Sequence, residues 1–97
     1  MRTAFDWDPA KAASNLVKHR VSFDEAIAVF RDPLALSRLD ERHGANEERW
    51  VTLGQGGNGR LIVVVHTYSE THEASASIRI IGSAADKPRG ETIREEP

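Results

Sequence analysis

Apolar residues recur every three or four positions in the first third of the chain, which is the spacing of one face of an α-helix. Ala13, Leu16 and Val17 form such a stripe, so a helix is predicted over residues 9–20. Asp8 precedes this helix as an N-cap whose carboxylate can accept the free amide protons of the first turn. The polar face of the helix is expected to carry Lys11, Asn15 and Lys18.

A second helix is predicted directly after the first, because Ser22 and Glu25 form the S-x-x-E capping box that satisfies two free amide groups. Pro33 disfavours helical geometry in the residue before it and therefore ends this helix. Its apolar face consists of Phe23, Ala26, Ile27 and Phe30. The hydrophobic core is expected where the strand over residues 61–65 meets the helical residues Leu16, Val17, Phe23, Ile27 and Phe30.

Beyond residue 33 the hydrophobic pattern alternates with a period of two, which predicts β-strands. Strands are expected over residues 34–39, 49–53, 60–68 and 74–81, with a loop over 40–47 and turns over 55–59 and 69–73. The strand over residues 60–68 contains Leu-Ile-Val-Val-Val and is expected to be central and buried on both faces. Together with a short strand before the first helix, this order predicts an α+β fold. Two N-terminal helices would pack on one face of a mainly antiparallel β-sheet.

Residues 82–97 are rich in glycine, proline and charged residues, and Ile93 is the large apolar residue among them. Such a segment cannot bury enough apolar surface to offset the entropy lost when it is ordered. Residues 1–81 are therefore expected to form a single domain, and residues 82–97 are expected to form a loose C-terminal tail.

Composition narrows the classes of function that fit the chain. The 97 residues include no cysteine, which excludes a disulfide, a thiolate metal site and a cysteine nucleophile. No apolar run approaches the roughly 20 residues of a membrane span, and the N-terminus lacks the apolar core of a signal peptide, so a cytoplasmic protein without membrane contact is expected. The net charge of -2 lacks the basic bias that is usual in nucleic-acid-binding proteins. A domain of this size is modestly stable, so a partner or a homodimer would stabilise it.

Several short motifs occur in an order and spacing that resembles the BrnT family of bacterial toxins, whose fold is similar to that of RelE. The motifs are Phe5-Asp-Trp-Asp-Pro9, Asn15-x-x-Lys18-His19, Val21-Ser-Phe-Asp-Glu-Ala26, Phe30-x-Asp-Pro33, Arg49, Gly54, the run from Gly59 to Thr67, and Ile78-Arg-Ile-Ile81. The resemblance implies an endoribonuclease that cleaves RNA without a metal ion or another cofactor and inhibits translation. It also implies a cognate antitoxin similar to BrnA, with a ribbon-helix-helix domain, and contact with DNA only through that antitoxin.

RNA cleavage without a metal needs groups that transfer protons and groups that stabilise the charged phosphorane. Histidine suits proton transfer near neutral pH, and arginine binds phosphate through paired, charge-assisted hydrogen bonds. The candidate catalytic residues are Arg79, His19, Arg60 and His66, and the candidate RNA-binding residues are Lys18 and Arg49. The histidines of the chain are scattered along it, so no metal site is expected.

The candidates also have purely structural interpretations. His66 ends an apolar strand, where a histidine is commonly half-buried and hydrogen-bonded. His19 lies at a helix C-terminus, where the helix dipole alone favours it. Arg79 alternates with isoleucines and is therefore expected on the open face of the sheet. There it would either bind phosphate or form an ion pair with a helix acid such as Glu25.

The C-terminal segment departs from the family pattern. The last strand of the family usually continues into Ser-Ala-Arg and a basic helix, whereas Ala85 stands here in place of the arginine. If the missing groups carry phosphate contacts, the chain is a degenerate, non-catalytic toxin homologue that serves as a protein-binding or dimerisation module. The sequence leaves the ribonuclease and the binding module open as alternatives.

Overall fold

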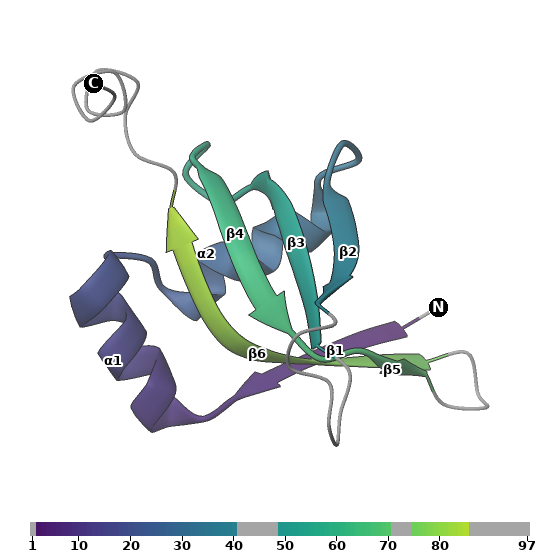
Figure 1. The fold of residues 1–97 in the computed structure, drawn as a ribbon, viewed down its shortest axis with the longest axis horizontal. Helices are drawn as coiled ribbons and strands as arrows, with labels where there is room; N and C mark the ends of the chain where they lie inside the picture. Colours follow the sequence, from purple (N-terminus) through teal and green to yellow (C-terminus); the bar gives the residue numbers. More distant parts are fainter. Residues whose placement is uncertain (1, 41–48, 71–74, 86–97) are drawn as a thin grey trace.

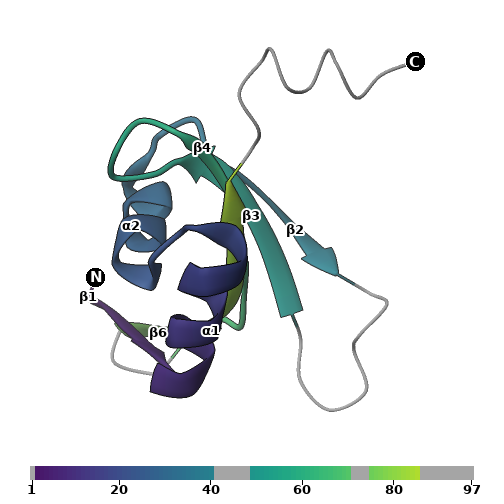
Figure 2. The same cartoon turned by 90° about the vertical axis from the view of Figure 1, so that its left-hand side faces the viewer.

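The computed structural model describes residues 2–40, 49–70 and 75–85, in which two helices lie against one face of a twisted β-sheet (Figure 1, Figure 2). Along the chain the elements are β1 (Arg2–Trp7), α1 (Pro9–His19), α2 (Phe23–Ile27), the 3₁₀ helix η1 (Ala28–Arg31), β2 (Leu36–Asp40), β3 (Arg49–Gln55), β4 (Leu61–His66), β5 (Ser69–Glu70) and β6 (Ser75–Ala85). The strand order is β1-β6-β4-β3-β2, and β5 pairs with β6. β1 is parallel to β6 and the other pairs are antiparallel, so the predicted α+β fold is confirmed.

Helix α1 begins and ends where the sequence predicts. The Asp8 carboxylate accepts a hydrogen bond from the Ala10 amide at 2.9 Å, as expected of an N-cap. The helix ends at Arg20, whose backbone adopts the left-handed conformation with φ of 60°. The Arg20 amide donates to the Leu16 carbonyl at 2.9 Å, which satisfies one of the last free carbonyls of the helix.

The buried face of α1 differs from the prediction. Asn15 is buried, whereas Leu16 is 49% and Val17 is 78% exposed, so the expectation that these two apolar residues join the core is wrong. The physical reason is the position of α1 beside β6 (Figure 1), where β1 pairs only as far as Ile80. Beyond that point the β6 backbone needs another acceptor, and the Asn15 side chain provides it for the Ser83 amide at 3.1 Å.

The second helical segment shows the Ser22 half of the predicted capping box, whereas the Glu25 carboxylate binds Arg60, and the segment then changes its geometry. The Ser22 hydroxyl accepts a hydrogen bond from the Glu25 amide at 3.0 Å. After Ile27 the chain continues as the 3₁₀ helix η1, which has three residues per turn. The fully buried face therefore follows a spacing of three, with Phe23, Ala26 and Val29 in the core. Ile27 and Phe30 pack against that core but are partly buried.

The core lies between this helical segment and the two central strands. Val21, Phe23, Ala26 and Val29 meet Ile62 and Val64 of β4 and Ile78 and Ile80 of β6. β4 is central in the sheet, as predicted, but it is not buried on both faces. Buried residues of β4 alternate with more exposed ones, and Leu61 is 45% exposed, because the helices cover only one face of the sheet (Figure 2).

The last strand is longer than the sequence predicts. β6 continues to Ala85, and residues 82–85 pair with residues 62–65 of β4, so the expected domain boundary after residue 81 falls inside a strand. A short strand, β5, forms where a turn was expected from Ser69. Most of the predicted loop at 40–47 and the part of the tail from residue 86 lie outside the described residues. Within the described residues, no helix is long and apolar enough to cross a membrane.

Candidate functional site

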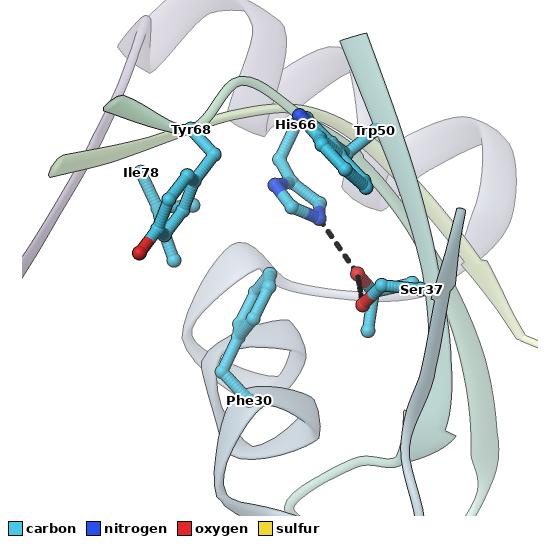
Figure 3. A pocket seen from close by; sticks show the side chains of 7 residues that line it. Phe30, Ser37, Trp50, His66, Tyr68 and Ile78 are labelled. Atoms are coloured by element: carbon cyan, nitrogen blue, oxygen red, sulfur yellow. Dashed lines mark hydrogen bonds between the residues drawn. The ribbon is translucent and has the colours of Figure 1, made fainter. Parts of the chain in front are cut away.

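A pocket of about 260 Å³ opens beside His66, the last residue of β4 (Figure 3). Its walls include three aromatic side chains from separate parts of the chain, which are Phe30 of η1, Trp50 of β3 and Tyr68 after β4. The Phe30 and His66 rings meet edge to face, with their centroids 4.8 Å apart. Tyr68 is 37% exposed, so its ring is accessible from solvent. The pocket is therefore mainly aromatic and open on one side.

A chain of hydrogen bonds runs along one wall of this pocket (Figure 3). His66 Nε2 lies 2.7 Å from the Thr52 hydroxyl, which lies 2.7 Å from the Ser37 hydroxyl. On its other side, His66 Nδ1 lies 2.9 Å from the Thr67 carbonyl oxygen. Strand pairing builds the chain, because Ser37 of β2 lies opposite Thr52 of β3 in the register.

The direction of these hydrogen bonds follows from the chemistry of the groups. A carbonyl oxygen can only accept, so His66 Nδ1 carries a proton and donates a hydrogen bond to the Thr67 carbonyl oxygen. Burial lowers the pKa of His66 below its ordinary value of 6.5, although the hydrogen bond to Thr67 opposes this shift. The ring is therefore neutral at pH 7, and Nε2 accepts a hydrogen bond from the Thr52 hydroxyl. The Thr52 oxygen then accepts from Ser37, which leaves the lone pairs of the Ser37 oxygen free to accept.

His66 itself is poorly placed to touch a substrate. The residue is 4% exposed, and both ring nitrogens are used within the protein. Its geometry matches the structural interpretation made from the sequence, a hydrogen-bonded histidine at the end of an apolar strand.

Arg60 and Arg79 each form an ion pair, but Glu25, the helix acid named in one of the two alternatives for Arg79, is not the partner of Arg79. Glu25 binds Arg60, with its Oε2 2.7 Å from Nη2 and 3.1 Å from Nε. Arg79 instead donates through Nη1 to Asp6 of the neighbouring strand β1, at 3.0 Å. Both members of the Arg79–Asp6 pair are more than half exposed. Arg79 points away from the buried isoleucines on either side of it, as the alternation predicts.

The other candidates lie at separate places in the fold. Lys18 and His19 are exposed at the C-terminal end of α1. Arg60 reaches this end, because its Nη2 donates to the Arg20 carbonyl at 2.9 Å. His66 is six residues further along the chain, or roughly 20 Å in a strand. The structure therefore groups Lys18, His19 and Arg60 but does not bring His66 to them. Arg79 is also separate from this group, because its carbonyl accepts a hydrogen bond from the amide of Thr67, next to His66, at 2.9 Å.

Arg49 is half-buried at the start of β3, next to the pocket residue Trp50. The Arg49 Nε and the Trp50 indole nitrogen are buried donors without a hydrogen-bond partner within the structure as described. Within the same residues, no group of three or more acidic or histidine side chains is arranged to hold a metal ion.

Sequence reasoning did not identify Ser37, Thr52 and Tyr68 as parts of a site. Serine, threonine and tyrosine are ordinary strand and turn residues, and no short motif connects them. The signal that could have found them is the register of β2, β3 and β4, which the sequence alone does not supply.

Comparisons with known proteins identify a family and a solved structure that are similar to this chain. Residues 7–87 match the family described as "Ribonuclease toxin, BrnT, of type II toxin-antitoxin system". The 1.1 Å crystal structure of the Brucella abortus ribonuclease toxin BrnT superposes with a TM-score of 0.58 and 16% sequence identity, over 91% of this chain and 100% of that chain. At this identity the structural similarity concerns the fold alone. Among curated protein sequences, none matches the chain.

Proposed function

The chain belongs to the BrnT family of ribonuclease toxins of type II toxin–antitoxin systems, and we propose that it is an active endoribonuclease that needs no metal ion. The observation that carries the proposal is the family match over residues 7–87, which includes both helices, the strands from β2 to β6 and every candidate site residue. Cleavage of RNA in the cytoplasm would then block translation.

The proposed reaction is attack of a ribose 2′-hydroxyl on the adjacent phosphate. The 2′-oxygen loses its proton and bonds to phosphorus, while the bond from phosphorus to the 5′-oxygen breaks and that oxygen gains a proton. An arginine stabilises the charge on the phosphate oxygens through several N–H donors. No step requires a metal ion if water carries the protons.

We assign the phosphate contact to Arg79. Its guanidinium is half-exposed, and the Asp6 carboxylate that it binds is more exposed still. An exposed ion pair of this kind contributes little to stability, so a phosphate group can displace Asp6 at small cost. His19 lies with Arg60 at the other end of β4 from Arg79, which lies beside Thr67, and both ring nitrogens of His66 are occupied within the protein. We therefore assign the proton transfers at this phosphate to water.

Membership of a type II toxin family implies an antitoxin partner, and we propose that this partner carries a ribbon-helix-helix domain. Only the antitoxin would contact DNA. The open face of the sheet supports a protein interface, since it exposes the large apolar residues Leu36, Leu53 and Leu61. Covering such a surface would raise the melting temperature of the toxin by an amount that grows with the logarithm of antitoxin concentration.

The test is cleavage of purified RNA by the purified protein, in the presence of EDTA. Arg79→Ala should reduce the rate by roughly 10²–10³. Asp6→Ala is the matched control, because it removes the same ion pair but keeps the guanidinium, and it should retain activity. Equal losses in both variants would mean that the ion pair matters and a phosphate contact does not. Loss of cleavage in EDTA that added Mg²⁺ restores would contradict the metal-free reaction.

The alternative function is a non-catalytic homologue that binds a protein partner or itself. Two observations favour it, namely the net charge of -2 and Ala85 in the place of an arginine. A wild-type protein that leaves RNA intact across a range of pH but binds the antitoxin would establish this alternative in place of the ribonuclease.

A further inference from the structure

The pocket beside His66 has no part in the cleavage chemistry proposed above, yet it combines flat apolar walls with one polar wall. The rings of Phe30, Trp50 and Tyr68 come from three different elements and surround one space (Figure 3). Tyr68 is held in place by its hydroxyl, which donates to the Glu70 carboxylate at 2.7 Å. A space bounded by ring faces and edges suits a planar aromatic ligand better than a branched aliphatic one.

The polar wall presents a defined hydrogen-bonding group. Because neutral His66 accepts from Thr52, and Thr52 accepts from Ser37, the Ser37 hydroxyl proton is already in use. The Ser37 oxygen therefore faces the pocket as a hydrogen-bond acceptor, and an N–H or O–H group of a ligand can donate to it. In addition, the indole N–H of Trp50 is buried and has no hydrogen-bond partner among the residues that the structure describes.

We propose that this pocket receives an unpaired nucleobase of the RNA substrate, stacked against Tyr68 and Trp50, with one base N–H donated to the Ser37 oxygen. This inference rests on the proposed function, because RNA is the ligand. A nucleobase supplies the three properties that the pocket requires, which are a flat π-face, N–H donors and acceptor atoms. An apolar side chain of a protein partner would supply none of the polar groups and would leave Ser37 without a donor. Stacking of bases on aromatic side chains is the usual way in which proteins hold single-stranded RNA.

The experiment is an NMR titration of the full, isotope-labelled chain with each nucleoside 5′-monophosphate, with ribose 5-phosphate as the ligand that lacks a base. We expect the nucleotides to shift the indole signal of Trp50 and the backbone signals of Ser37 and Tyr68, and ribose 5-phosphate to leave them unchanged. Tyr68→Ala should weaken binding roughly tenfold or more, whereas Tyr68→Phe keeps the ring and should bind like the wild type. Ser37→Ala should weaken binding by a smaller factor, because it removes one neutral hydrogen bond.

The inference is overturned if ribose 5-phosphate produces the same shifts, or if Tyr68→Ala binds nucleotides as tightly as the wild type. It is also overturned if nucleotides leave the pocket unchanged while the antitoxin shifts its signals, since the pocket would then serve the protein partner. Cleavage of RNA by the same sample, measured in parallel, separates the two ideas. Cleavage without binding in the pocket would overturn the inference and support the ribonuclease. Binding in the pocket without cleavage would support a base-binding pocket and contradict the ribonuclease.

Discussion

Replacing Asn15 by alanine should destabilise the protein more than any single substitution on the apolar stripe of α1. The Asn15 side chain makes three buried hydrogen bonds, with the Val21 carbonyl at 3.0 Å, the Ser83 hydroxyl at 3.1 Å and the Ser83 amide at 3.1 Å. These contacts attach α1 to the end of β6 and to the connection before α2. Asn15 is thus the polar centre of an otherwise apolar contact.

The magnitude follows from the groups that the substitution would leave unpaired. Val21 and Ser83 are both buried, so water cannot easily replace the lost partner. Each orphaned backbone group costs about 1–3 kcal/mol, and two of them give a loss of roughly 2–6 kcal/mol. A domain of this length has a free energy of unfolding of about 5–15 kcal/mol, so Asn15→Ala should be folded but weakened severely.

The assay is urea unfolding followed by tryptophan fluorescence and circular dichroism, which must agree for a two-state analysis. Ser14→Ala is the matched control, because Ser14 is exposed on the same helix and should change stability by about 0.5 kcal/mol or less. Val17→Ala should also change little, since that side chain is 78% exposed. The reasoning would be refuted if Val17→Ala cost more than Asn15→Ala, because the apolar stripe of α1 would then face the core after all.

Three further predictions concern local geometry and pH. Gly54→Ala should cost about 1–3 kcal/mol in urea unfolding, because its Cβ would lie 3.0 Å from Val29 Cγ1 and 3.1 Å from Ala35 Cβ, whereas Gly57→Ala meets only ordinary contacts and should be nearly neutral. Arg20→Gly should raise the melting temperature slightly, since glycine adopts the left-handed conformation without strain and the carbonyl that Arg60 binds is retained; a clear fall would contradict this. His66 has a lowered pKa in the folded state, so the unfolded chain binds its proton first and stability falls as pH drops below 6.5. His66→Gln should therefore lose less stability than the wild type between pH 7 and pH 5, and parallel pH profiles would argue against a buried neutral ring.

The local signals in the sequence predicted the elements of this fold well. Asp8 and Ser22 cap their helices as expected, because an N-cap acts on amides two or three residues away. The period-two pattern located β3, β4 and β6, and the Leu-Ile-Val-Val-Val run correctly identified the central strand. The motifs scattered from residue 5 to residue 81 also identified the family, which the match over residues 7–87 confirms.

The tertiary structure decided which side chains meet. Glu25 pairs with Arg60 and not with Arg79. The partner of Arg79 is Asp6, which lies 73 residues earlier in the sequence. The chain from Ser37 through Thr52 to His66 exists only because three strands align in one register.

Asn15 gives the clearest case of this division. Its spacing in the helix predicts a solvent-exposed residue, since a polar side chain on a polar face needs no partner. It is buried because β6 extends past the end of β1 and leaves a backbone amide that requires an acceptor, and that amide belongs to Ser83, 68 residues along the chain. Helix caps and hydrophobic periods depend on near neighbours and can be read along the chain. Hydrogen-bond partners between elements depend on how those elements are placed together, and no local pattern contains that information.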